Sequence, residues 1–399
     1  MKHLLRLIFG WFFLVLGVLG LFLPLLQGIL FLAIGFLLLA PNVPVFRRVL
    51  RWIQRKYPRV YEKLPGKTKH GLKRSRGKKM KAVFIEEYGG PEVLRLGEQP
   101  QPVARHGEVL IKVYAAGMNP RDFMVRQGTY PFKFAIPAFP FVLGSDVAGV
   151  VARVGKDVTD FHEGDAVYAM QTTFGGFGAY AEYMAVRAKA VGHKPKNMNF
   201  AEAAAVPCAG QTAWQSLLDL GGLKSGQKVL IVGASGSVGS YAVQIAKIFG
   251  AGVTGVCSTN NVERVLALGA DRVVDYKQER FNDTVKDQDL VFDTLGMESL
   301  KSVRPVLKPR GIYVTTVPGG KHIRDALLTA LWPWGRRVKV IAVKAKGEVL
   351  EKLREEIEAG RIRSEIDTVY PLEAVAEAQR YLRTFHTRGK LILRLRPEP

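Results

Sequence analysis

The chain has 399 residues, of which 48% are hydrophobic and 23% are charged, and these values exclude a disordered protein. Its net charge of +23 is concentrated at one end, because residues 1–79 hold 16 lysines and arginines against one acid, Glu62, whereas residues 80–399 hold 42 against 34. The two cysteines, Cys208 and Cys257, exclude a disulfide framework and fit a reducing compartment.

Residues 7–40 carry no charge, and this run exceeds the roughly 20 residues that one membrane-spanning helix needs. Pro24 and Gly28 interrupt the run near its middle, and basic residues lie on both sides of it. Both features favour a hairpin with two cytoplasmic ends, although one long tilted helix or a re-entrant hairpin remains open. We expect residues 1–46 to form a transmembrane hairpin in an inner or plasma membrane, with the remaining domains in the cytoplasm.

Residues 47–79 are predicted to form a basic juxtamembrane linker. Its first part, from Arg47 to Ile53, has the mixed basic and apolar character of a short interfacial helix, and the part after Pro65 resembles a solvated tether. No fold is visible that would present these charges to a nucleic acid, so we expect attraction to anionic lipid headgroups and no nucleic-acid partner.

Short β-type runs with glycines begin at Met80, and a βαβ pattern follows at residues 228–257. An apolar strand there leads into a G-x-x-G-x-x-G motif and then a helix. Such glycines allow a tight turn and close approach to a pyrophosphate, which the helix N-terminus stabilises. The sequence therefore predicts a dinucleotide site that includes Gly233, Ser235, Gly236, Ser237, Val238 and Gly239.

The residues after the second strand of this unit indicate which dinucleotide is bound. An NAD enzyme commonly places a carboxylate there to hold the ribose hydroxyls, but this chain has none until Glu263. Ser258, Thr259 and Asn260 could instead form hydrogen bonds to a 2′-phosphate without repelling it. This pattern favours NADP.

From Met80 to about Leu393 the chain resembles the zinc-independent quinone oxidoreductases of the medium-chain dehydrogenase/reductase family. The matching segments include MKAVFIEEYGGPEVL, GMNPRDF, LGSDVAGVVARVG, AAAVPCAGQTAWQSL, VGASGSVGSYAVQIAK, LGADRVVDY and RGKLIL. The resemblance implies an α/β fold with a Rossmann doubly wound parallel sheet at residues 206–339 and a GroES-like β-rich catalytic domain at residues 80–205, completed by residues 340–399. Met80 then resembles the start of an oxidoreductase joined to a membrane anchor.

The resemblance also implies roles for single residues. Asn119 corresponds to an asparagine near the nicotinamide and the substrate, and Tyr130 to a tyrosine that either donates a proton or forms a wall of the substrate cleft. Thr212, Tyr276, Val317 and Lys390 correspond to cofactor-binding positions, with helix capping as the alternative for Thr212. Relatives often dimerise through the last Rossmann strand, here near residues 312–317, so a homodimer is possible.

The residues present do not predict a metal site. Zinc-dependent relatives have a cysteine near the position of Met118 and a Gly-His-Glu where this chain has Gly144, Ser145 and Asp146. A catalytic zinc needs three good ligands, and Asp146 alone does not supply them. His106, His162, His193 and His322 show no ligand spacing, and we expect them at the surface.

These features together predict a membrane-tethered, NADPH-dependent enzyme that transfers hydride to a quinone or to the β-carbon of an α,β-unsaturated carbonyl compound. The alternative is a non-catalytic NADPH-binding sensor or scaffold at the membrane. Met124 keeps this alternative open, because it stands where some bacterial quinone reductases have a tyrosine that could donate a proton. A further alternative is that translation starts at Met80 and not at Met1.

Overall fold

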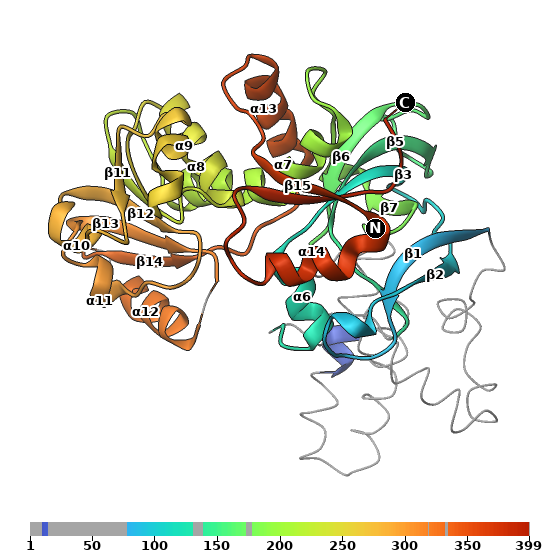
Figure 1. Cartoon of the computed structure of the whole chain (residues 1–399), viewed down its shortest axis with the longest axis horizontal. Coiled ribbons are helices and arrows are strands. Elements are labelled where there is room, and N and C mark those ends of the chain that lie inside the picture. Colours follow the sequence, from blue (N-terminus) through green and yellow to red (C-terminus); the bar gives the residue numbers. More distant parts are fainter. Residues whose placement is uncertain are drawn as a thin grey trace, which may run out of the picture.

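The computed structural model describes residues 10–14, 78–130, 139–172, 178–317, 319–331 and 334–398 (Figure 1). The predicted transmembrane hairpin, residues 1–46, and the predicted linker, residues 47–79, lie almost entirely outside this set. Within the described residues, no helix is both long enough and apolar enough to cross a membrane.

Two β-sheets form the catalytic lobe. A three-stranded antiparallel sheet has the order β2-β1-β4, and a seven-stranded sheet has the order β15-β16-β3-β5-β6-β8, with β7 paired to β3. The strands are β1 (Lys79–Ile85), β2 (Arg95–Pro100), β3 (Glu108–Gly117), β4 (Phe141–Val142), β5 (Asp146–Val154), β6 (Ala166–Met170), β7 (Tyr183–Arg187), β8 (Val191–His193), β15 (Ile366–Pro371) and β16 (Lys390–Arg394). Its helices are α6 (Pro120–Gln127), α13 (Gly347–Glu358) and α14 (Val375–Leu382).

The second lobe is a Rossmann-type sheet of six parallel strands in the order β11-β10-β9-β12-β13-β14. The strands are β9 (Lys228–Val232), β10 (Gly252–Cys257), β11 (Arg272–Asp275), β12 (Gln288–Asp293), β13 (Leu307–Thr315) and β14 (Arg337–Val340). The helices are α8 (Ser237–Ile248), α9 (Val262–Ala267), α10 (Phe281–Thr284), α11 (Leu300–Val303) and α12 (Gly320–Ala330). In Figure 1, α8 and α9 lie on one side of this sheet and α10, α11 and α12 on the other.

Side chains of the central strands alternate between these two helical layers. Val229 and Ile231 of β9 pack into one core with α7 (Phe200–Trp214) and α8. Leu230 and Val232 pack into a separate core with residues of α10 and α11. This burial on both faces explains why β9 is a continuous apolar run, as expected for a strand inside a parallel sheet.

Helix α7 connects the two lobes and lies between their sheets (Figure 1). One continuous core runs from Ala148 and Tyr168 in the seven-stranded sheet, through α7, to the Rossmann strands. A π-helical segment, Gln215–Leu220, continues α7. Gln211 and Gln215 on these two segments form hydrogen bonds to the backbone of residues 344–346, where the chain returns to the catalytic lobe.

The structure corrects the expected dimerisation strand. β13, which contains most of residues 312–317, is paired on both sides, to β12 and to β14. The exposed edge at this end of the sheet is β14, because residues 337–340 add one more parallel strand that the sequence reasoning did not include. Pairing of two chains through β13 is therefore blocked by the chain itself.

Candidate active site

The turn between β9 and α8 has the geometry of a phosphate cradle. Gly233 has a φ of +78°, and a Cβ there would lie 2.5 Å from Thr294 Oγ1. A Cβ on Gly239 would lie 2.1 Å from the Gly233 carbonyl oxygen, so this glycine lets α8 pack directly against the turn. Gly236 differs, because a Cβ there would meet only the Gly233 oxygen, at 3.4 Å, and otherwise faces open space. Two glycines therefore serve backbone packing, and the third leaves room for a ligand.

The N-terminus of α8 offers hydrogen-bond donors to that open space. Gly236 is its N-cap residue and has no side chain that could satisfy the first backbone N–H groups. The hydroxyl of Ser237 is buried and has no partner among the described residues. A helix N-terminus with unused donors is a site for a pyrophosphate. Ser235 precedes Gly236 in the turn and Val238 lies in the first turn of α8, and their contact with a cofactor stays a prediction.

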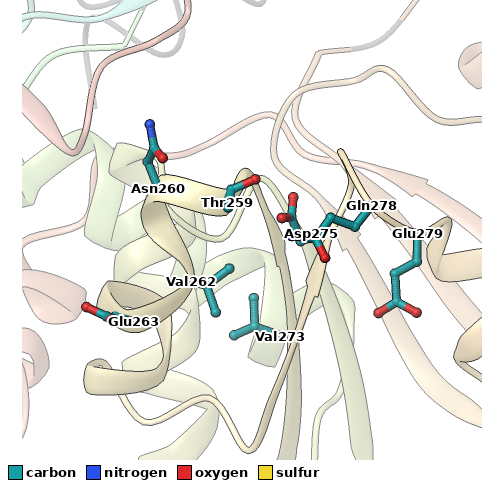
Figure 2. A pocket seen from close by; sticks show the side chains of 8 residues that line it. All are labelled: Thr259, Asn260, Val262, Glu263, Val273, Asp275, Gln278 and Glu279. Carbon is teal, nitrogen blue, oxygen red and sulfur yellow. The ribbon is translucent and has the colours of Figure 1, made fainter.

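A pocket of about 790 Å³ opens at the carboxyl ends of β10 and β11 (Figure 2). Two residues predicted to contact the cofactor, Thr259 and Asn260, line it, and Ser258 precedes them with its hydroxyl bonded to Asn261 at 2.9 Å. Tyr276 lies just after β11 and has an exposed side chain. The structure thus brings together the segments that were predicted to hold the adenosine end.

Asp275 is a pocket residue that the sequence reasoning missed. It ends β11, and its carboxylate lies beside the side chain of Thr259 (Figure 2). A hydrogen bond from the Thr259 side chain lowers the pKa of Asp275, and Lys277 N donates to Asp275 Oδ1 at 3.0 Å. Asp275 lies on the third strand of this unit and not on the second, but it reaches the same place because neighbouring parallel strands end at the same edge of the sheet.

A buried polar network occupies the catalytic lobe beside α7. Lys390 Nζ donates to Asn119 Oδ1 at 2.8 Å and to Asp146 Oδ2 at 3.1 Å, and the side chains of Lys390 and Asp146 are only 2% and 0% exposed. Asn119 Nδ2 contacts Ser145 Oγ at 3.3 Å and Asp146 Oδ2 at 3.2 Å. The amide of Asn119 is therefore held from both ends, which fixes its orientation.

The same network reaches α7, since Cys208 N donates to Asp146 Oδ2 at 3.3 Å. Burial raises the pKa of the Cys208 thiol to about 11, so this cysteine stays protonated at neutral pH. Thr212, one turn further along α7, is buried and forms a hydrogen bond with the Cys208 side chain. Thr212 therefore lies against the polar network, on the helix that also packs on α8.

Helix α6 carries two further charged residues that the sequence reasoning left without a site role. Asp122 Oδ2 accepts hydrogen bonds from Asn119 N at 2.8 Å and from the Tyr180 hydroxyl at 2.7 Å. Burial nevertheless raises the pKa of Asp122 to about 6. Arg121 Nη2 donates to the Gln171 carbonyl at 3.0 Å. Burial lowers the pKa of Arg121, but its electrostatic interactions with the nearby Cys208 and Asp122 outweigh burial and hold this pKa above the usual value.

The remaining predicted residues lie in separate places. Tyr130 follows α6, is half-buried, and packs on the core of the catalytic lobe. Val317 follows β13 and is exposed, with its carbonyl close to Gly296 at the end of β12. Lys390 lies inside the polar network, where its ammonium group already has two partners, so its contact with a cofactor stays a prediction.

One surface prediction is wrong. His322 is only 1% exposed. Its Nδ1 accepts a hydrogen bond from Gly319 N at 2.9 Å, and its Nε2 lies 2.7 Å from the carbonyl oxygen of Glu298. It fixes the start of α12 to the loop after β12. Position in a turn-like segment indicated exposure, but a histidine with two hydrogen-bond partners can be buried at little cost.

The fold and the site define a two-lobed oxidoreductase that binds a dinucleotide at a Rossmann sheet. Residues 105–196 match the family described as the alcohol dehydrogenase GroES-like domain, and residues 268–393 match the zinc-binding dehydrogenase family. The chain is 39% identical to an NADPH-dependent alkenal/one oxidoreductase of Arabidopsis thaliana, over 79% of this chain and 80% of that protein. It therefore belongs to the medium-chain dehydrogenase/reductase family.

Two further relatives share this organisation. A 2-methylene-furan-3-one reductase from Solanum lycopersicum is 38% identical over 79% of this chain and 79% of its own length. The solved structure of the quinone oxidoreductase from Coxiella burnetii is 32% identical and superimposes with a TM-score of 0.74, covering 80% of this chain and all of that one. The shared part corresponds in length to the predicted oxidoreductase, residues 80–399.

The zinc implied by one family description does not fit the residues of this site. Among the described residues, no three His, Cys, Asp or Glu side chains are grouped to hold a metal. Asp146 is the one carboxylate of the polar network around Lys390, and its Oδ2 already accepts from Lys390, Asn119 and Cys208 N. The Lys390 ammonium thus supplies the positive charge at this carboxylate, and we derive no step through a metal.

Proposed function

We propose that this chain is an NADPH-dependent reductase whose acceptors are quinones or α,β-unsaturated carbonyl compounds. The observation that carries the proposal is the fixed amide of Asn119, held by Lys390 and Asp146, on the lobe that α7 joins to the phosphate cradle. The relatives named above support the same chemistry, since they are an alkenal/one oxidoreductase, a 2-methylene-furan-3-one reductase and a quinone oxidoreductase.

A bound NADPH would supply a hydride to the conjugated acceptor, and the negative charge that results would be delocalised onto the acceptor's oxygen until a proton is added. The task of the protein is to orient both reactants and to stabilise that oxygen. Asn119 Oδ1 accepts one hydrogen bond, from Lys390, and keeps a second lone pair for a donor such as the nicotinamide carboxamide. Arg121 would stabilise the oxygen through its positive charge, because its pKa is held above the usual value, and Tyr130 would return a proton to the product.

We propose NADPH as the preferred dinucleotide. Ser258, Thr259 and Asn260 would hold the 2′-phosphate, and Gly236 with the N-terminus of α8 would hold the pyrophosphate. Tyr276 and Val317 would contact the adenosine and nicotinamide ends. Asp275 weakens the preference for NADPH over NADH, because its carboxylate lies at the same pocket and repels the negative charge of a 2′-phosphate.

We also propose that residues 1–46 anchor the enzyme in a membrane, with residues 47–79 as the linker. The proposal rests on the sequence, in which residues 7–40 are uncharged and apolar. Fractionation of cells that express the full chain tests it. Recovery in the membrane fraction after a high-salt wash is expected, and a soluble full-length chain without detergent would refute it.

Steady-state oxidation of NADPH and NADH by the full chain, with a panel of quinones and enones, tests the proposed reaction. We expect turnover with NADPH above that with NADH. Asn119→Ala should lower kcat/KM by about tenfold to a hundredfold, because the substrate or cofactor loses its fixed partner. Asn197→Ala is the matched control, since that amide bonds only the Ile357 carbonyl at 2.8 Å. NADPH binding without turnover on any acceptor would favour the sensor or scaffold instead.

A further inference from the structure

Helix α12 has its large apolar side chains on the outside. Ile323, Leu327 and Leu328 are exposed on the helix, and Leu331 and Trp334 just beyond it are 80% and 71% exposed. The inward face is made by smaller or polar groups: His322 is buried, Ala326 packs on the core, and Thr329 Oγ1 accepts from Val338 N at 3.0 Å. The helix is therefore fixed to the sheet by small and polar side chains.

Helix α13 shows the usual arrangement and serves as the comparison. It buries Val349, Leu350, Leu353 and Ile357, and it exposes charged side chains. Both helices have similar lengths and both cover a sheet (Figure 1). Because contiguous apolar surface of this kind is uncommon on monomeric soluble proteins, the reversed face of α12 indicates a surface that is covered in use.

The charges on this face indicate what covers it. Lys321 and Arg324 are exposed among the apolar residues, and Arg337 is exposed where β14 begins. Asp325 is the one acid within α12, and Arg324 pairs with it at 2.9 Å. Leucine and isoleucine with tryptophan and basic residues on one exposed face are the composition of a helix that lies on an anionic lipid surface.

A second copy of this chain fits the face less well. In a twofold contact each copy presents the same surface, so the net positive charge of Lys321, Arg324 and Arg337 against the one acid Asp325 would meet the same positive charge on the other copy. A bilayer with anionic headgroups instead meets these cations with opposite charge, while long arginine and lysine side chains keep their ends at the headgroup level. The 34-residue uncharged run at residues 7–40 gives the same chain a second membrane-seeking element.

The face also adjoins the proposed active site. Lys321 Nζ donates to the Met297 carbonyl at 3.2 Å, which ties the start of α12 to the loop after β12. That loop and the residues after β13 expose Leu295, Met297 and Val317, so further apolar side chains are exposed at the carboxyl ends of these strands. In a parallel α/β sheet this is the edge where ligands bind.

We propose that the outer face of α12, with Leu331 and Trp334, docks on an anionic lipid bilayer and turns the carboxyl edge of the Rossmann sheet toward it. This docking goes beyond the proposed anchor at residues 1–46, because it fixes which side of the enzyme faces the lipid. A substrate dissolved in the bilayer would then be close to the site; that consequence alone rests on the proposed function.

An environment-sensitive fluorophore on Leu327→Cys or Leu331→Cys tests the docking in the full chain, reconstituted in vesicles. Sedimentation with vesicles would not separate docking from anchoring, whereas a label reports its own surroundings. The native cysteines should react little near pH 7.5, because burial raises the pKa of both Cys208 and Cys257 to about 11. Val103→Cys, at an exposed apolar position of the catalytic lobe, is the matched control.

In vesicles containing phosphatidylglycerol we expect labels at 327 and 331 to shift to the blue and to be quenched by nitroxide lipids, while the label at 103 stays as in water. Pure phosphatidylcholine or 0.5 M salt should weaken the shift. Equal, water-like spectra at all three positions in the anionic vesicles would overturn the proposal. A shift in detergent without vesicles that grows with protein concentration would also overturn it, in favour of a second copy. Neither readout depends on turnover, so these results are independent of the proposed reaction.

Discussion

The phosphate cradle and the buried polar network both present polar groups, but the sequence determines their structures in different ways. The cradle uses seven consecutive residues, 233–239, and its properties follow from glycine geometry. The network joins Asn119, Asp146, Cys208 and Lys390, from four elements, with Asn119 and Lys390 separated by 271 positions. Local steric rules therefore account for the first region, whereas the second depends on the tertiary fold.

The largest expected effect tests the ion pair in the network. Lys390→Met leaves the carboxylate of Asp146 buried without its cationic partner and should lower the free energy of unfolding by about 3–5 kcal/mol. Denaturant unfolding monitored by fluorescence measures it. The double variant Lys390→Met with Asp146→Asn should recover part of the loss, because no buried charge then remains unpaired.

The surface ion pair between Lys79 and Glu98 is the matched control for that experiment. Its two side chains are 71% and 66% exposed and screened by water, so Lys79→Met should leave the free energy of unfolding close to that of the wild type. Equal losses for Lys390→Met and Lys79→Met would show that burial of the first pair does not set its contribution.

The second prediction concerns pH and Asp122, beside the same network. Burial raises the pKa of Asp122 to about 6, above its ordinary value of 3.8, so the folded state binds this proton more tightly than the unfolded state. The resulting stabilisation is present below about pH 4 and is lost as the pH rises through 6, a change of about 3 kcal/mol. Asp122→Asn should remove this contribution to the stability profile.

Urea unfolding of both proteins at several values between pH 4 and pH 8 checks the Asp122 prediction. The difference in free energy of unfolding between wild type and variant should change by about 3 kcal/mol across this range. Parallel profiles would mean that Asp122 has an ordinary pKa. A change of the opposite sign would mean that Asn119 N, Tyr180 and Arg121 outweigh burial.

The third prediction tests the cradle. Gly239→Ala puts a Cβ 2.1 Å from the Gly233 oxygen and should lower the free energy of unfolding by about 1–3 kcal/mol, with weaker NADPH binding. Gly236→Ala meets only an open surface and should keep nearly normal stability, yet still weaken NADPH binding. Thermal unfolding with and without NADPH measures both effects. Loss of stability in Gly236→Ala, or normal stability in Gly239→Ala, would contradict the separate roles given to these glycines.

The sequence predicted much of the fold because its signals are local. The Rossmann βαβ unit was recognisable from an apolar strand, spaced glycines and an amphipathic helix, and the structure places them as β9, α8 and β10. Two things could not be read from local pattern. One is the partner of a buried group, as for Lys390 and His322, and the other is the edge of a sheet, as for β14. Both depend on which distant segments meet. Helix α7 also crosses residue 205, the predicted domain boundary, because its core is shared by both lobes.

The smallest predicted effect concerns Asp275, which the sequence reasoning missed although it lines the pocket proposed to hold the 2′-phosphate. Asp275→Asn removes a negative charge near the proposed 2′-phosphate and should raise the preference for NADPH over NADH by about threefold to fivefold. Initial rates with each dinucleotide measure this ratio. Glu279→Gln removes a charge from the same pocket, but its side chain points away from Thr259 in Figure 2, so it should change the ratio less. Equal changes in the two variants would mean that the general field of the pocket, and not the position of Asp275 beside Thr259, tunes the choice of dinucleotide.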